Sequence, residues 1–127
     1  MTTSYNLANK LINATLGNVT YTSPASVYAS LYSTVPTANT SGTELTGNGY
    51  ARQVTTFASA ANGIASSNAV VTFGACTGNA WPIVTAVGIT DASTAGNIMY
   101  FNTIPGRNIQ VGDSLVFGSG NITITLS

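Results

Sequence analysis

Charge is nearly absent from this sequence. Three basic and three acidic residues make up 5% of the 127 residues, whereas an ordinary soluble protein carries roughly 25%. They are Lys10, Arg52, Arg107, Glu44, Asp91 and Asp113. Scattered basic residues form no patch for a polyphosphate, so nucleic acid is not an expected partner. A nearly neutral surface also does not repel further copies of itself, which favours self-association.

Histidine is missing and cysteine occurs once. The chain therefore lacks the side chain that most often serves as general base and metal ligand. Cys76 cannot form an internal disulfide, and we expect it to be a small buried residue. The three carboxylates are far apart in sequence, and we expect Asp91 and Asp113 to cap turns. We predict a non-enzymatic protein with no cofactor and no metal.

Long apolar runs are also missing. No segment approaches the roughly 20 apolar residues of a membrane span, and the N-terminus lacks the apolar core of a signal peptide. We therefore expect no membrane partner, synthesis in the cytoplasm, and export only as part of a larger particle.

Most of the chain has a β pattern. Thr, Val, Ile and Tyr dominate, and Gly or Pro interrupts them about every eight to twelve residues. The segment from Trp81 to Ile89 is apolar on both faces, which is typical of a central strand. We predict strands at 18–22, 26–33, 50–57, 69–74, 83–90, 97–103, 107–111, 114–118 and 121–126.

The C-terminal end and the segment 35–49 differ in pattern. Apolar residues alternate with threonine from Ile122 to Leu126. Gly118-Ser119-Gly120 predicts a hairpin that joins this strand to residues 115–117. The segment 35–49 contains Gly, Pro and many hydroxyl groups without periodicity, which predicts a long loop.

Residues 4–16 are the one good helix candidate. Ser4 can cap the start, and Gly17 can end the helix in a left-handed turn. One side carries Leu7, Leu11 and Ile12, among other apolar residues. A helix of this length is marginal alone in water. Its apolar stripe must therefore pack either on its own domain or, as an assembly arm, on another subunit or a shell.

Together these patterns predict an all-β fold, a two-sheet jelly-roll-like β-sandwich with a short N-terminal helix. We divide the chain into an N-terminal helical arm, 1–17, and a single β-sandwich domain, 18–127.

Several motifs in order resemble a group of small phage proteins labelled tail fibre, head fibre or capsid decoration proteins. The resemblance covers roughly residues 26–127. Its motifs are Gly47-Asn48-Gly49-Tyr50-Ala51-Arg52-Gln53, Asn68-Ala69-Val70-Val71-Thr72-Phe73, Trp81 to Asp91, Gly96-Asn97-Ile98-Met99-Tyr100, and Ile109 to Phe117. The resemblance implies a virion protein that trimerises, with itself and a major capsid protein or another virion protein as partners.

The motif residues also have structural interpretations. Tyr50 and Trp81 are expected to be core or edge anchors. Arg52 is expected to pair with a carboxylate or to bind strand carbonyls, and Gly88 to permit a close backbone approach. The possible assembly contacts are Leu7, Leu11, Ile12, Tyr50 and Arg52.

Three functions remain open from the sequence. The first is a capsid cement or decoration protein that trimerises and stabilises the shell. The second is a tail or head fibre module that binds host surface glycans through loop 35–49 and exposed aromatics such as Tyr28 or Tyr32. The third, a secreted carbohydrate-binding module, is disfavoured because a signal peptide and paired cysteines are missing.

Overall fold

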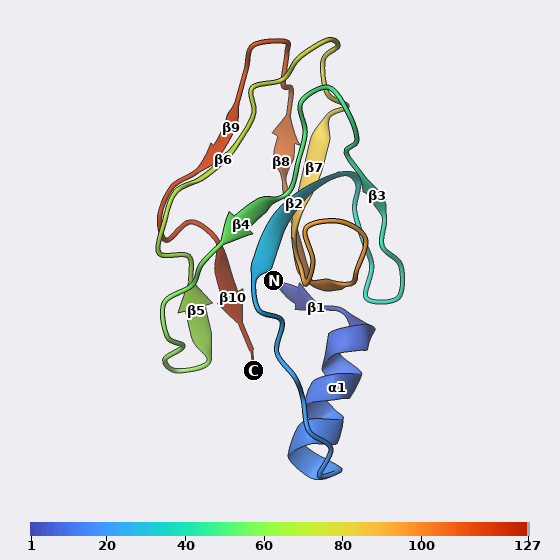
Figure 1. Cartoon of the computed structure of the whole chain (residues 1–127), viewed down its shortest axis with the longest axis vertical. Helices are drawn as coiled ribbons and strands as arrows, with labels where there is room; N and C mark the ends of the chain where they lie inside the picture. The colour runs from blue at the N-terminus through green and yellow to red at the C-terminus, as the bar shows by residue number, and fades with distance from the viewer. Residues whose placement is uncertain (127) are drawn as a thin grey trace.

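The computed structural model describes residues 1–126, so Ser127, the end of the predicted domain, lies outside the described residues. The chain forms layered antiparallel strands with one short helix at its N-terminal end (Figure 1). This confirms the predicted all-β, sandwich-like fold. In chain order the elements are β1 (Thr2–Thr3), α1 (Tyr5–Leu16), β2 (Val27–Thr34), β3 (Thr43–Glu44), β4 (Gln53–Thr55), β5 (Ile64–Ser66), β6 (Val71–Phe73), β7 (Val84–Thr90), β8 (Ile98–Arg107), β9 (Leu115–Phe117) and β10 (Thr123–Thr125).

The central sheet is built on β2, β7 and β8. Its strand order is β1-β8-β7-β2-β3, and β4 pairs with the first half of β2. β3 and β4 therefore lie one after the other along the same edge of β2. β7 lies between β2 and β8, and nearly all of its residues are buried. The prediction of a central strand is confirmed, since a strand covered on both faces is apolar on both faces.

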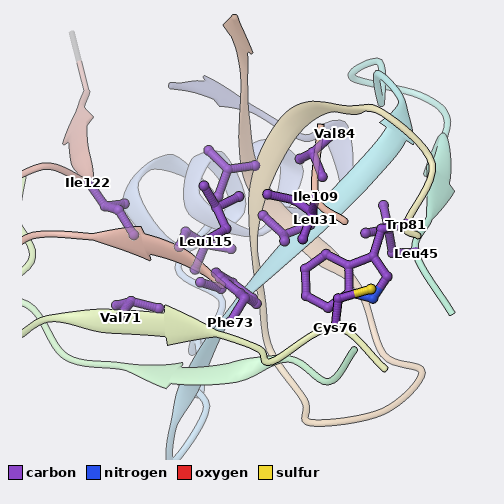
Figure 2. Close-up of a cluster of buried hydrophobic side chains, with 13 residues drawn as sticks. Leu31, Leu45, Val71, Phe73, Cys76, Trp81, Val84, Ile109, Leu115 and Ile122 are labelled. Atoms are coloured by element: carbon purple, nitrogen blue, oxygen red, sulfur yellow. The ribbon is translucent and has the colours of Figure 1, made fainter. Parts of the chain in front are cut away.

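Two separate ribbons, β5–β10 and β6–β9, complete the second layer. β6 buries Val71 and Phe73 and exposes Thr72, as the pleat of a strand requires. Leu115 on β9 and Leu31 on β2 belong to the same buried cluster as Phe73, and Figure 2 shows these side chains gathered there. The second layer is thus two short ribbons rather than one continuous sheet.

The core contains the residues that the sequence assigned to it. Trp81 is 4% exposed, and Cys76 is buried in the same cluster (Figure 2). The indole Nε1 of Trp81 donates a 2.8 Å hydrogen bond to the carbonyl of Asn48, which satisfies its polar edge. Gly88 permits a close approach as predicted, because a Cβ there would lie 2.8 Å from Cε2 of Tyr32.

Helix α1 begins as predicted but ends differently. The hydroxyl of Ser4 accepts a 3.3 Å hydrogen bond from the backbone N–H of Leu7. The left-handed turn predicted at Gly17 is wrong, because Gly17 has φ −96° and Asn18 has φ 55°. The N–H of Gly17 still donates to the carbonyl of Asn13, so the helical hydrogen bonding continues one residue further before the chain reverses.

Two strand predictions are wrong between the helix and the C-terminus. Residues 18–22 form no strand, and β1 rather than this segment pairs with β8 at residues 100–101. The segments 97–103 and 107–111 were expected to be separate, but β8 runs from Ile98 to Arg107. Pro105 does not interrupt β8, because β1 pairs only with residues 100–101 on that side and leaves the rest as an open edge.

The predicted C-terminal hairpin is also wrong. The Gly118–Gly120 turn forms, with the N–H of Asn121 donating to the carbonyl of Gly118 over 3.0 Å. After the turn the strands diverge, because β9 pairs with β6 and β10 pairs with β5. Each strand therefore takes a partner that is distant in sequence.

Three short strands were not predicted: β1, β3 and β5. The segment 35–49, expected to be a loop, contains β3 and buries Leu45. The other predicted strands are present, several of them shorter, as with β4 inside 50–57. Among residues 1–126 there is no helix with the length and apolar character needed to cross a membrane.

Candidate functional site

The predicted contact residues occupy two places in the structure. Leu7, Leu11 and Ile12 lie on α1, which Figure 1 shows extending beyond the strands at one end of the molecule. Tyr50 and Arg52 precede β4 and meet at the carboxylate of Glu44 on β3. The structure therefore brings Tyr50 and Arg52 together, while the helix residues form a different surface.

The apolar stripe of α1 is only partly covered by the rest of the chain. Leu7 is 3% exposed and packs into the domain, and Leu11 is half-buried. Ile12 is 54% exposed, and Tyr5 and Leu16 are exposed as well. Positions 5, 12 and 16 project from the same side of a helix. We call Tyr5, Ile12 and Leu16 the helix ridge.

A shallow apolar groove lies beside the helix ridge. It has a volume of about 330 Å³ and reaches from α1 to the C-terminal segment. Its lining consists of Thr3, Ala8, Leu11, Ile12, Thr15 and Leu126. Small side chains at Ala8 and Thr15 leave the depression, and the half-exposed Leu126 forms its far side. We call it the helix groove.

The second place is a polar cluster around Glu44. Oε1 of Glu44 accepts a 2.8 Å hydrogen bond from Nη2 of Arg52, and Oε2 accepts one of 2.9 Å from Nε. Oε2 also accepts a 2.6 Å bond from the hydroxyl of Tyr50. The two-point contact between Arg52 and Glu44 is the geometry in which a guanidinium binds a carboxylate most strongly.

Arg52 extends this cluster to the loop between β7 and β8. Its Nη1 donates to the carbonyls of Ala92 and Ala95, both over 2.7 Å. Oδ1 of Asp91 accepts a 2.7 Å bond from the N–H of Asn97, which closes the loop (Figure 1). The prediction that Arg52 pairs with a carboxylate is confirmed, whereas the carbonyls that it binds belong to a loop and not to a strand as predicted.

These contacts shift the ionisation of the cluster. Burial alone would raise the pKa of Glu44, but the hydrogen bonds from Arg52 and Tyr50 outweigh it and hold that pKa below the usual value. Burial and the bond to Glu44 raise the pKa of Tyr50. The hydrogen bonds that Arg52 itself donates to Glu44 raise the pKa of Arg52. At neutral pH the cluster is therefore a fixed ion pair with a neutral phenol.

Tyr50 also belongs to the core, as predicted for an anchor. Its ring stacks with Phe73 at a centroid distance of 6.1 Å and meets the edge of Trp81 at 5.9 Å. Its hydroxyl accepts a 3.0 Å hydrogen bond from the N–H of Leu31. One residue thus joins the core, β2 and the Glu44 cluster.

The sequence pattern did not identify several residues of the helix ridge and of the Glu44 cluster. Glu44 was placed in a loop, although it is the only carboxylate close to Arg52 in sequence, and that closeness was an available signal. Tyr5 and Leu16 lay in the helix pattern, but nothing in the pattern showed which apolar side would stay open. Tyr32, expected to be exposed for glycan contact, is 1% exposed, and Tyr28 is half-buried.

The remaining carboxylates serve their own turns, as predicted. Asp91 closes the β7–β8 loop, and Oδ2 of Asp113 accepts a 3.1 Å hydrogen bond from the N–H of Gln110. Within residues 1–126 no three histidine, cysteine or carboxylate side chains gather as a metal site.

The comparison with family models gives one result that bears on this geometry. The model described as Podophage GP4 fiber I protein gp80 matches residues 2–125. It therefore spans α1, both ribbons and the central sheet. No curated protein sequence matches the chain.

Proposed function

We propose that this chain, which belongs to the Podophage GP4 fiber I protein gp80 family and is therefore a fibre-type structural component of a phage virion, is a fibre subunit. In this proposal the subunit assembles as a homotrimer through α1. Residues 1–17 are the assembly arm, with Ile12 and the half-buried Leu11 as central contacts, whereas the predicted contact Leu7 is buried by its own domain and is not available to another subunit. In this role the protein functions through contacts with other virion subunits and not through catalysis.

The partly uncovered helix carries the proposal. The domain covers Leu7 but leaves the helix ridge exposed beside the helix groove. Soluble proteins seldom expose a contiguous apolar patch unless it is a contact surface. The alternative, that α1 only covers its own sandwich, accounts for the buried Leu7 and the half-buried Leu11 but not for the exposed helix ridge.

A second copy of the chain is the occupant that fits best. The ridge of one subunit has the apolar character that the groove of the next requires, and this head-to-tail contact closes into a ring when the rotation allows. Equal numbers of basic and acidic residues give no net repulsion between copies. The trimeric number itself comes from the resemblance to phage fibre and decoration proteins.

Cement and fibre roles share this mode of assembly. The family description names a fibre, so we place the fibre role first and keep the cement role as the second candidate. In either role the trimer attaches to another virion protein, such as the major capsid protein. Immunogold labelling of the parent virion distinguishes the two, because cement lies over the shell and a fibre projects from head or tail.

The assembly test keeps the domain intact. Deleting residues 1–17 would also remove β1, which pairs with β8. The double variant Ile12→Gln with Leu16→Gln changes only the ridge, and glutamine has a helix propensity close to that of leucine. We expect trimers of the native chain by light scattering at micromolar concentration, and monomers of the variant with an unchanged Tm.

The matched control is Lys10→Gln with Asn13→Gln on the polar side of α1, which should remain trimeric. A native chain that is monomeric at micromolar concentration contradicts the proposal. So does a ridge variant that is still trimeric.

A further inference from the structure

A groove on the flank of the β7–β8 loop lies apart from the helix ridge, although Ser4 and Asn6 at the start of α1 line one end of it. Three adjoining hollows of about 530, 180 and 350 Å³ follow one another along this loop. The first two share Glu44, Arg52 and Ala95, and the last two share Ser41, Gly96 and Ile98. The hollows therefore form one elongated depression, which we call the loop groove.

Both walls of the loop groove are held in place. On one side the two carbonyl contacts of Arg52 hold the β7–β8 loop. On the other side the N–H of Tyr5 donates to the carbonyl of Ala38 over 2.8 Å, and the N–H of Thr40 donates to Oγ1 of Thr37 over 3.0 Å. A groove with walls formed in advance loses little conformational entropy when a ligand binds.

The chemistry of the lining selects against charge. Glu44 and Arg52 are the only charged side chains among the residues that line the three hollows, and they neutralise each other. An anionic ligand would find no free cation, and a cationic ligand would find no free carboxylate. Burying an unpaired ligand charge here would cost free energy.

The same lining suits a ligand rich in hydroxyl groups. Exposed Asn39, Ser41 and Thr94 line the groove. Amides and hydroxyls donate and accept hydrogen bonds at once, as sugar hydroxyls do. Tyr50 lines the largest hollow, but its ring packs on Phe73 and Trp81 and its hydroxyl is bound to Glu44 and Leu31, so only the exposed part of the ring can meet a ligand. The two smaller hollows present mainly polar surface, whereas the largest presents mainly apolar surface, so the apolar peptides in the test below are a necessary comparison.

We infer that the loop groove binds a neutral oligosaccharide chain. The elongated shape fits several sugar units in a row. The inference does not depend on trimerisation through α1, because the groove shares none of the ridge residues. It changes the predicted glycan surface: the segment 37–50 contributes one wall, but Tyr28 does not line the groove and Tyr32 is buried, so neither offers an exposed ring there.

The experiment uses the full chain on a printed array of neutral and acidic bacterial oligosaccharides, with apolar peptides as a third class. We expect binding to one or more neutral glycans and to no acidic glycan or peptide. The variant Thr94→Trp places a large side chain in the first hollow and should weaken the glycan Kd at least tenfold. Ser59→Trp, on an exposed residue outside the groove, is the matched control and should bind as the native chain does.

Circular dichroism and light scattering of the same samples keep this test separate from the assembly test. If the chain is monomeric but binds neutral glycan through this groove, the inference holds although the trimer proposal fails. Binding to no neutral glycan overturns the inference, as does a preference for acidic glycans or peptides. A folded Thr94→Trp variant that keeps native affinity overturns it as well.

Discussion

The central sheet and helix α1 differ in how completely the chain buries their apolar side chains. Along β7 nearly every side chain is buried by β2, β8 and the ribbons. Along α1 only Leu7 is fully buried, while Ile12 and Leu16 remain open. One chain is therefore enough to bury the apolar side chains of the sheet, whereas the helix keeps exposed apolar surface that a second subunit can cover. The variants below test this contrast, from the largest expected effect on stability to the smallest.

Trp81→Ala should have the largest effect, because it opens a cavity in the complete part of the molecule. We expect a loss of about 3–5 kcal/mol in the free energy of unfolding, measured by urea denaturation. The control Val116→Ala removes a half-exposed side chain and should stay within about 0.5 kcal/mol. A Trp81→Ala variant that folds normally but loses its partner would show that Trp81 is a ligand contact.

Glu44→Gln should cost about 3 kcal/mol, because it leaves the guanidinium of Arg52 partly buried without its carboxylate. The pH dependence gives a second test. The folded pKa of Glu44 lies below its ordinary value of 4.5, so the ion pair stabilises the fold above pH 4.5 and is lost as pH falls further, through the folded pKa.

Urea denaturation at several pH values checks this dependence. The native chain should lose stability in that acid range, and Glu44→Gln should lose less. Tyr50→Phe is the matched control, because it removes one bond to Glu44 and keeps the ion pair. An equal acid sensitivity in native chain and Glu44→Gln would contradict this role of Glu44.

Ser4→Ala should have an intermediate effect, because Ser4 connects the two regions. Its hydroxyl caps α1 and also donates a 2.6 Å hydrogen bond to the carbonyl of Ile98 on β8. Losing the cap should cost about 1 kcal/mol, seen as a lower Tm. Thr15→Ala, near the other end of α1, removes a hydroxyl that bonds only to its own helix and should change little. Equal effects of the two variants would rule out a special role for Ser4.

The sequence predicted what depends on local pattern. The apolar run of β7, the helix, the Ser4 cap and the buried Trp81 each have a signal within a few residues. The pairing of β10 with β5 has no such signal, because it joins strands 57 residues apart, as the contact between Ser66 and Thr123 shows. The close spacing of 115–117 and 121–126 favoured a hairpin, but tertiary pairing overrode it.

The candidate site divides in the same way. The pattern on α1 identified the apolar residues but not which of them the domain would leave open. The neighbours Tyr50 and Arg52 were recognised as a motif, yet their common partner was missed. Glu44 reaches them because β3 and β4 lie along the same edge of β2, and a sequence pattern does not show that adjacency.

Leu16→Ala should have the smallest effect, and the sharpest comparison is with Leu7→Ala in the same helix. Both variants remove the same atoms and gain the same helix propensity. Leu7 is 3% exposed and Leu16 is 84% exposed. Leu7→Ala should therefore cost about 2–5 kcal/mol, and Leu16→Ala less than about 0.5 kcal/mol, in a dilute monomeric sample. If α1 joins subunits, association stabilises the native chain more at higher protein concentration, with the logarithm of that concentration. The Tm of Leu16→Ala should then fall below that of the native chain as concentration rises. A Leu16→Ala cost above about 1 kcal/mol in the monomer would mean that the domain itself already covers Leu16, and the contrast between sheet and helix would fail.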